Sequence, residues 1–334
     1  MIGWDVGGAN VKAAHVALEA GRRSIHTVSR PFEIWRDKAS LPAVLRAIAD
    51  GLPPAEATAV TMTAELSDVF RTKREGVGFV LDAVCLVSNQ APGVFTTSGG
   101  FLDPEAARAR PLDVAASNWM ATALLLARHT RDALLVDVGS TTTDVIPIQG
   151  GRVAARGRTD PERLLAAELV YTGALRTSVA AIVPSVPLRG GECPVAAEFF
   201  ALSGDVHVLL GHLDPGQYTC PAPDGRPPTP EFAAERLARV VCADVEMLGR
   251  DEILGIARAV ADAQVRQIAT AISQVNKRLD GSSDVIATGL GAFLAHLAAA
   301  ACGLRSRDLS DVLGADVGLA APAVAVAWLL AEAR

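Results

Sequence analysis

Two short segments of the chain place an aspartate two residues before a glycine, at the start of a turn of small residues. The first reads I-G-W-D-V-G-G-A-N-V-K around Asp5, and the second reads L-L-V-D-V-G-S-T-T-T-D around Asp137. Turns of Gly, Ser and Thr expose backbone N–H groups that can hold phosphate oxygens. A carboxylate beside such a turn suits Mg²⁺, which takes carboxylate, water and phosphate oxygens as ligands. These residues therefore predict phosphate or diphosphate binding with Mg²⁺, held by Asp5 and Asp137.

When the two segments are aligned on their aspartates, Gly7 falls opposite Gly139 and Lys12 falls opposite Asp144. Lys12 is the candidate for neutralising a phosphate oxygen. A single turn of this kind is common in ordinary β-structure, but two matched turns favour a shared role. A third glycine-containing segment, with Gly289 and Gly291, follows a late apolar stretch. The candidate phosphate contacts in the two turns are Gly7, Gly8, Asn10, Gly139, Ser140, Thr141 and Thr142.

The elements that must position these residues follow from the hydrophobic pattern. Each aspartate ends an apolar strand, and an alternating return strand follows the turn, which is typical of a β-hairpin. Further strands are predicted at 58–62, 77–84 and 284–288. Helices are predicted at 41–51, 114–128, 161–176, 231–248, 251–279 and 315–333.

The chain of 334 residues is long enough for two domains, and the repeated hairpin predicts two related lobes. We expect a first lobe over 1–115, with the C-terminal helix of 315–334 packing back on it. The second lobe covers 116–314 and has a lid or insertion around 184–230, which is rich in Pro and Gly. The fold class is α/β, with mixed sheets flanked by helices and the substrate in a cleft between the lobes.

Composition limits the class of function. The net charge is −6 and no long Lys/Arg run is present, which argues against nucleic-acid binding. The most apolar stretches, 285–304 and 317–330, are interrupted by Gly, His or Pro and indicate buried helices, so no membrane partner is expected. The odd number of cysteines, the lack of a C-x-x-C pair and the N-terminus without a signal peptide predict a cytoplasmic protein. Nothing in the sequence specifies an oligomeric state.

Three motifs, D-V-G-G-A-N-V-K, D-V-G-S-T-T-T-D and A-T-G-L-G-A, resemble the two phosphate motifs and the nucleoside motif of the actin, Hsp70 and sugar-kinase superfamily. The resemblance spans nearly the whole chain and implies a two-lobed, actin-like (ribonuclease H-like) ATPase fold. It also implies metal or phosphate roles for the residues named above. Asn10 stands where many of these kinases have Thr, and G-L-G-A is shorter than the usual glycine-rich stretch. ATP is therefore a weaker expectation than Mg²⁺.

A closer resemblance rests on V-T-M-T-A-E-L-S-D-V-F-R-T-K-R-E-G-V at 60–77 and A-A-S-N-W-M-A-T-A at 115–123. These segments are similar to hydantoinase/oxoprolinase-related proteins of tetrahydromethanopterin-linked one-carbon metabolism, the methanofuran-biosynthesis synthases. The resemblance implies a transferase that condenses (5-(aminomethyl)furan-3-yl)methyl diphosphate with the phenol of γ-glutamyltyramine, or of a tyrosine analogue. The product is an aryl ether, and diphosphate is released.

Such a reaction assigns roles to particular residues. Negative charge develops on the leaving diphosphate, where Mg²⁺, the turn N–H groups and Lys12 would act. The phenol has an unperturbed pKa of about 10 and needs a carboxylate to accept its proton. Asp144 and Glu65 are the two candidates for that base. The candidates for further substrate contacts are Lys73, Arg74 and Asn118.

Two other functions stay open from the sequence. An ATP-dependent small-molecule kinase or a hydantoinase-like hydrolase would bind nucleotide and release ADP. A non-catalytic actin-like nucleotide switch or filament subunit would use its cleft to control assembly instead of turning over a small substrate. The lack of long partner-binding insertions argues against the switch.

Overall fold

The computed structural model describes residues 1–19, 22–279 and 283–334 of the chain. Two compact units are formed. Unit 1 comprises Met1–Ala133, Ile146–Ala166 and Leu309–Arg334, and unit 2 comprises Leu134–Val145 and Ala167–Asp308. This division differs from the predicted boundary at residue 115, since helix α5 (Asn118–Ala127) packs on α13 (Ala321–Glu332) inside unit 1.

Unit 1 is built on a mixed six-stranded sheet, in which β1 runs antiparallel to β2 and parallel to β4. In spatial order the strands are β3 (Arg22–Pro31), β2 (Asn10–Glu19), β1 (Ile2–Val6), β4 (Thr58–Met62), β5 (Gly93–Phe95) and β6 (Phe101–Leu102). The remaining elements of unit 1 are η1 (Lys38–Ser40), α1 (Leu41–Ala49), η2 (Ala64–Leu66), α2 (Lys73–Val87), α3 (Pro104–Ala109), α4 (Pro111–Val114), β9 (Arg152–Val153), α6 (Asp160–Leu165), α12 (Leu309–Leu313) and η4 (Gly318–Ala320).

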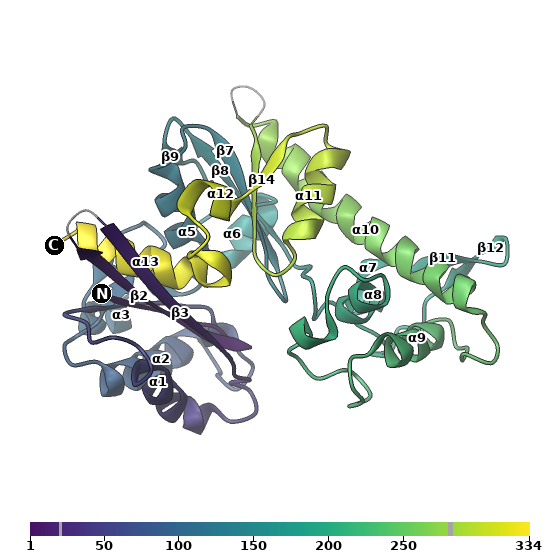
Figure 1. Cartoon of the computed structure of the whole chain (residues 1–334), viewed down its shortest axis with the longest axis horizontal. Coiled ribbons are helices and arrows are strands. Elements are labelled where there is room, and N and C mark those ends of the chain that lie inside the picture. The colour runs from purple at the N-terminus through teal and green to yellow at the C-terminus, as the bar shows by residue number, and fades with distance from the viewer. Residues whose placement is uncertain (20–21, 280–282) are drawn as a thin grey trace. The chain divides into compact units, whose positions relative to one another are not determined.

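The central strand β1 is covered on both faces, because side chains alternate along a strand. Trp4 and Val6 join the core that α1 and α2 cover. Positions 3 and 5 face the other side of the sheet, where α13 packs against β1, β2 and β4. Figure 1 shows α13 beside β2. A side chain at position 3 would overlap the Ala323 carbonyl of α13, so the close approach of helix and strand requires glycine there.

The second sheet is also mixed, with β13 parallel to both β7 and β14 and with β8 antiparallel to β10. In spatial order its strands are β10 (Leu169–Val170), β8 (Thr143–Gln149), β7 (Ala133–Val138), β13 (Val285–Thr288) and β14 (Ser306–Asp308). A separate hairpin pairs β11 (Ser185–Leu188) with β12 (Gly191–Pro194). The helical elements of unit 2 are α7 (Val179–Ile182), α8 (Ser203–Leu209), η3 (Pro215–Gln217), α9 (Pro230–Arg239), α10 (Arg250–Asn276) and α11 (Ala292–Ala301).

Helix α10 connects the two parts of unit 2. Its C-terminal half shares a core with β7 and β13, and its N-terminal half shares another with α7, α8 and α9. Figure 1 shows it running from the sheet to the β11–β12 hairpin. The α/β fold class predicted from the sequence, with mixed sheets flanked by helices, is therefore confirmed.

The local predictions have mixed outcomes. The strands at 58–62 and 284–288 and the helices at 41–51 and 251–279 are confirmed within a few residues. The strand predicted at 77–84 is wrong, because these residues lie inside α2. The hydroxyl of Thr72 accepts a hydrogen bond from Glu75 N at 3.2 Å and caps that helix, a signal that outweighs the apolar run which follows.

Two predicted helices are shorter than expected. The helix predicted over 114–128 is interrupted at Ala116, whose φ of 49° lies in the left-handed region, and α5 begins only after this break. The helix predicted over 161–176 ends after α6, where the chain turns back into β10. The predicted helices over 231–248 and 315–333 also correspond to the shorter elements α9 and α13.

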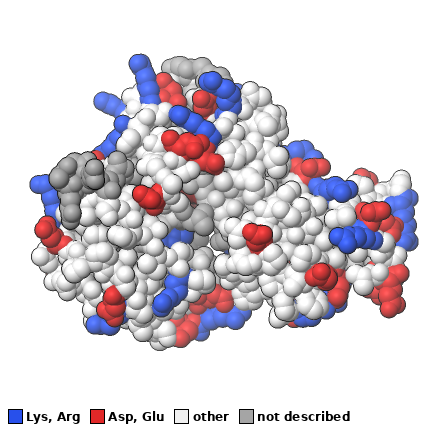
Figure 2. Space-filling view, in the orientation of Figure 1, with Lys and Arg blue, Asp and Glu red and all other residues white. Residues whose placement is uncertain are grey.

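On the face shown in Figure 2, acidic and basic side chains are interspersed, and neither sign forms a continuous stripe. Within the described ranges, no helix combines the length and apolarity needed to cross a membrane.

Candidate active site

The first glycine turn joins β1 to β2. Gly7 N donates to the Asn10 carbonyl at 2.9 Å, and the Gly8 carbonyl accepts from Ile34 N at 3.0 Å. Among the described residues, no acceptor takes the N–H groups of Gly8 and Ala9. The Gly8 carbonyl is thus hydrogen-bonded within the protein, while the N–H groups of Gly8 and Ala9 stay available for an anion.

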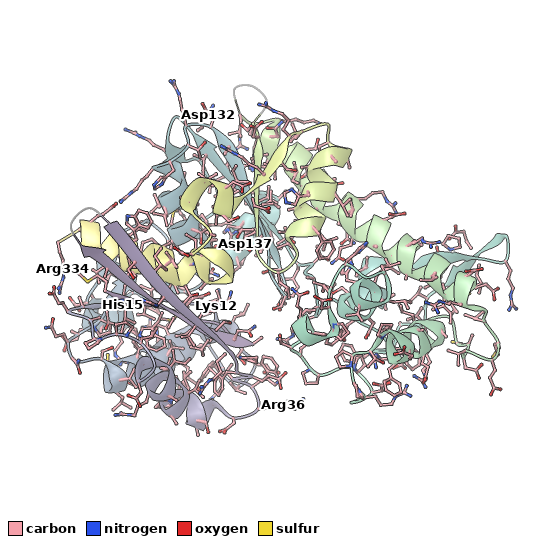
Figure 3. The ribbon with its side chains drawn as sticks, viewed as in Figure 1. Lys12, His15, Arg36, Asp132, Asp137 and Arg334 are labelled. Carbon is pink, nitrogen blue, oxygen red and sulfur yellow. The ribbon has the colours of Figure 1, made fainter. Side chains whose placement is uncertain are left out.

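Asp5 lies beside this turn and opposite Lys12 in the register of β1 and β2. Asp5 is only 5% exposed, and its Oδ2 is 4.0 Å from Lys12 Nζ. Lys12, on β2, is shown in Figure 3. Within the described part of the chain, Asp5 Oδ1 has no hydrogen-bond partner. Burial raises the pKa of Asp5, and the charge of Lys12 opposes that shift. A buried carboxylate oxygen without a partner, next to open N–H groups, fits a ligand of Mg²⁺.

Glu65 follows β4 and lies at the same edge of the sheet as the first turn. Because β1 and β4 are parallel, their carboxyl ends meet there, and Thr63 N donates to the Val6 carbonyl at 3.0 Å. Glu65 is in η2 and is 1% exposed. Gly76 of α2 packs on its backbone so closely that a Cβ at position 76 would lie 2.5 Å from the Glu65 carbonyl oxygen.

The carboxylate of Glu65 is part of a charged group of three side chains. Lys73 Nζ lies 2.7 Å from Asp160 Oδ2 and 3.6 Å from Glu65 Oε1. The longer separation is an ion pair without a hydrogen bond, and both Glu65 oxygens lack a hydrogen-bond partner among the described residues. The pKa of Glu65 is raised to about 7, mainly by burial; the charge of Lys73 opposes this shift, and the charge of Asp160 adds to it. A carboxylate with this pKa can exchange a proton near neutral pH.

The other predicted contacts of unit 1 have protein partners. Lys73 faces two carboxylates, which suits it to controlling the charge of Glu65. Arg74 Nη1 donates to the Arg108 carbonyl at 3.1 Å. Asn118 begins α5, and its Oδ1 accepts from the next backbone N–H at 2.9 Å.

The segment that carries Asp160 is anchored to the rest of unit 1 at two points. Arg158 Nη1 donates to the Thr97 carbonyl at 2.6 Å. The guanidinium of Arg163 stacks 4.2 Å above the ring of Trp119, and both side chains are buried. Asp160 is therefore held in place from both sides.

The second glycine turn, between β7 and β8, repeats the closure of the first. Gly139 N donates to the Thr142 carbonyl at 2.9 Å. The carbonyls of Gly139 and Ser140 accept from Ala174 N at 2.9 Å and Leu175 N at 3.0 Å. The matched sequences thus produce matched backbone geometry in each unit.

Close-packed glycines surround the second turn. A Cβ at Gly173 would lie 2.5 Å from Thr141 N. Gly289 has a φ of +87°, and a side chain there would overlap the carboxylate of Asp137. Asp137 lies near the end of β7 and is shown in Figure 3. Gly291 N donates to the β7 backbone at 2.8 Å. The G-L-G segment therefore packs directly against the predicted metal ligand of unit 2.

A neutral hydrogen-bond network supports the same turn. Gln264 Nε2 donates to Thr172 Oγ1 at 2.9 Å and to the Gly173 carbonyl at 2.8 Å. Its Oε1 then accepts from His207 Nε2 at 2.8 Å, which assigns the His207 proton to that nitrogen. Burial lowers the pKa of His207 to about 4, so the ring is neutral at pH 7.

Asp144, the second candidate base, lies on β8 opposite Leu169 of β10. In the described portion of the chain, no group of three or more His, Cys, Asp or Glu side chains has the arrangement to hold a metal ion. Mg²⁺ at Asp5 or Asp137 would therefore depend on water and substrate oxygens for its remaining ligands, which is its usual mode of binding.

Sequence reasoning missed three residues of these two sites. Asp160 was not singled out, although T-D-P-E at 159–162 is a capping box that marks the start of a helix. Gly76 stands in a quoted motif, but only the structure shows what it touches. Gln264 lies in an ordinary helical pattern that gives no sign of its contacts.

Comparison with known proteins identifies close relatives in sequence. The hydantoinase/oxoprolinase family profile matches residues 56–333. A protein of Methanocaldococcus jannaschii is 38% identical over 331 residues, which cover 99% of this chain and 97% of that protein. It is a (4-{4-[2-(γ-L-glutamylamino)ethyl]phenoxymethyl}furan-2-yl)methanamine synthase. A synthase of the same name from Methanococcus vannielii is 32% identical over 204 residues, 60% of this chain and 91% of that protein.

Solved structures with a similar arrangement are distant in sequence. The ethanolamine utilization protein EutJ of Carboxydothermus hydrogenoformans is 14% identical, with a TM-score of 0.47 over 98% of this chain and 89% of that one. The type IV pilus complex PilM–PilN gives 13% identity and a TM-score of 0.48 over 99% and 97% of the two chains.

Proposed function

The chain belongs to the hydantoinase/oxoprolinase family, and from this premise we propose that it is a synthase of methanofuran-type cofactor biosynthesis. The reaction condenses (5-(aminomethyl)furan-3-yl)methyl diphosphate with the phenol of γ-glutamyltyramine and releases diphosphate. The 38% identity to the M. jannaschii synthase over nearly the full length of both chains supports this assignment. The name of that relative contains a phenoxymethyl group on a furan, which is the aryl ether that the condensation forms.

One observation carries the mechanism: Glu65 is a buried carboxylate whose two oxygens have no hydrogen-bond partner among the described residues. Leaving buried carboxylate oxygens without partners costs free energy, so such an arrangement favours a functional role. The raised pKa of about 7 makes Glu65 a stronger base than an exposed carboxylate. Glu65 is therefore the base that we favour over Asp144.

In the proposed step, the carboxylate of Glu65 takes the proton of the phenol O–H. The phenol oxygen forms a bond to the furan-bearing CH₂ carbon, and the bond from that carbon to the diphosphate oxygen breaks. The electron pair of the broken bond leaves with the diphosphate. Both a good base and stabilisation of the leaving group lower the barrier.

The leaving group is assigned to the first glycine turn. The N–H groups of Gly8 and Ala9 would donate to its oxygens, and Lys12 would supply positive charge. Asp5 would hold Mg²⁺, which supplies further charge stabilisation to the diphosphate when it is bound. Asp137 is the corresponding ligand of unit 2. The sequence predicts that the second turn acts on the same substrate, and this stays a prediction.

The test is a direct assay with the furan diphosphate, γ-glutamyltyramine and Mg²⁺, followed by Glu65→Gln. Loss of a general base should lower kcat by about 10²- to 10⁴-fold. Diphosphate affinity, measured by isothermal titration, should stay within a few-fold, because Glu65 does not contact the leaving group. Asp144→Asn is the matched comparison, and a larger loss of kcat in that variant would transfer the role of base to Asp144.

Titration with ATP separates this function from a kinase. Diphosphate binding without ATP binding supports the synthase, whereas tight ATP binding with ADP release and no ether product would contradict it. We place the enzyme in the cytosol, and the free state of all five cysteines supports a reducing compartment.

A further inference from the structure

We propose that Asp160 is a positioning residue for this reaction: it draws Lys73 away from Glu65 and so keeps the Glu65 carboxylate open to the phenol. The inference rests on the proposed function, in which Glu65 is the base. It concerns a residue that lies outside the motifs from which the sequence predicted the site, 87 positions beyond Lys73.

The distances show which carboxylate Lys73 prefers. Its Nζ donates a hydrogen bond to Asp160 Oδ2 at 2.7 Å but stays 3.6 Å from Glu65 Oε1. A charge-assisted N–H···O bond is usually 2.7–2.9 Å long, so the contact with Asp160 is a full hydrogen bond and the contact with Glu65 is not. The exposed fractions of the Lys73 and Asp160 side chains are 22% and 16%, and that of Glu65 is 0%.

The position of Asp160 is fixed by its surroundings. It is the first residue of α6, whose start is closed by the capping box of Thr159 and Glu162. Arg158 and Arg163, which lie on either side of Asp160, hold the first turn of α6 against the rest of unit 1. Lys73, in the first turn of α2, is therefore hydrogen-bonded to a carboxylate whose position is fixed.

The electrostatic consequence has a definite sign. The charged groups that act on Glu65 are Lys73 from α2 and Asp160 from α6. Lys73 favours the ionised form of Glu65, and the negative charge of Asp160 disfavours it. If Asp160 were neutral, Lys73 could turn fully to Glu65, occupy one of its oxygens and lower its pKa. The base would then be both weaker and partly blocked.

Asp160→Asn tests this inference. In a pH profile of kcat/KM, activity rises as Glu65 loses its proton, and this acid limb should move down by about one pH unit in the variant. The rate on the plateau should fall several-fold, because a weaker base transfers the proton less readily. Asp160→Glu, which restores the charge, should return the limb toward its original position.

Two further variants separate charge from simple structural support. Glu162→Gln removes the same charge from the same helix but keeps the capping box, since Gln serves there as well. Its acid limb should not move. Lys73→Met removes the opposing charge, and its acid limb should move to higher pH.

An independent readout does not need turnover. The carboxyl band of protonated Glu65 can be followed by infrared difference spectroscopy against Glu65→Gln as the pH is raised. Its midpoint should fall in Asp160→Asn and stay unchanged in Glu162→Gln. If the wild-type protein forms no ether product, the proposed function fails, and this titration alone decides the role of Asp160. An unchanged midpoint in Asp160→Asn, or an equal shift in Glu162→Gln, would overturn the inference.

Discussion

Beside the first glycine turn lie two sets of buried charged side chains, whereas the second turn is supported mainly by neutral hydrogen bonds and close-packed glycines around the single carboxylate of Asp137. Both turns close with the same bond, from the N–H of the first glycine to the carbonyl three residues later, at 2.9 Å in each unit. Around the first lie Asp5 with Lys12 and Glu65 with its two charged neighbours. Around the second, Gln264 and a neutral His207 support the backbone.

This difference indicates a division of labour. Buried charges are costly and are kept where their ionisation is used, so unit 1 has the properties of a chemical site. Neutral networks and tight glycine packing fix a backbone without changing its charge, so the surroundings of the second turn have the properties of a rigid support. Variants in the two units should therefore fail in different ways.

The largest effect on stability is expected at Gly289. Gly289→Ala forces a side chain into a position with φ of +87° and against Asp137 and the Val138 carbonyl. Backbone strain and overpacking together should cost about 3–4 kcal/mol of the free energy of unfolding. Gly303→Ala is the control, since Gly303 also has a positive φ, of +69°, but no atom lies within 4 Å of its Cβ position. It should cost about 1 kcal/mol in the same denaturant titration, and equal costs would contradict the tight-packing account.

Glu65 of unit 1 and His207 of unit 2 should contribute to the pH dependence of stability in opposite directions. Glu65 has a folded pKa of about 7 against an ordinary value of 4.5, so its contribution to stability is fully present below pH 4.5 and is lost as the pH rises through 7. Glu65→Gln should therefore stabilise the protein at pH 8 by up to about 3 kcal/mol, with little effect at pH 4.5.

The contribution of His207 to stability should change with pH in the opposite direction. Its folded pKa of about 4 lies below the ordinary 6.5, so its contribution is present above pH 6.5 and is lost as the pH falls through 4. His207→Gln should flatten the decline of unfolding free energy between these values. Denaturant titrations of the wild-type protein and of each variant from pH 4.5 to 8 give the contribution of Glu65 and of His207 to the unfolding free energy at each pH. Contributions that change in the same direction with pH would contradict the contrast between these two residues.

A smaller effect on stability, combined with a large effect on activity, is expected at Gly76. Gly76→Ala places a Cβ 2.5 Å from the carbonyl oxygen of Glu65 and should displace that residue. Overpacking should cost about 2 kcal/mol, and a shift of the base by about 1 Å can lower kcat by about 10²-fold. Gly78→Ala in the same helix meets only the end of the Arg108 side chain, at 3.4 Å. It should keep full activity, and a similar loss there would mean that helix α2, and not Glu65, is the sensitive element.

Much of the fold could be predicted because its signals are local. Strand 58–62 and helix 251–279 follow from their hydrophobic patterns, which depend on residues near one another in the sequence. The strand predicted at 77–84 shows the limit of this approach. A short apolar run does not distinguish a buried strand from a buried helix, and the cap at Thr72 decides between them.

The sequence by itself determined the two hairpins and the family, because the turn chemistry of Asp5 to Lys12 and of Asp137 to Asp144 is contained in a few adjacent residues. Only the tertiary structure decided the charge of the site. Lys73 meets Asp160 across 87 positions, and Gly76 fixes Glu65 through packing of α2 on η2. Ionisation depends on burial and on neighbours within a few ångströms, and these are set by how distant elements pack, not by the order of residues along the chain.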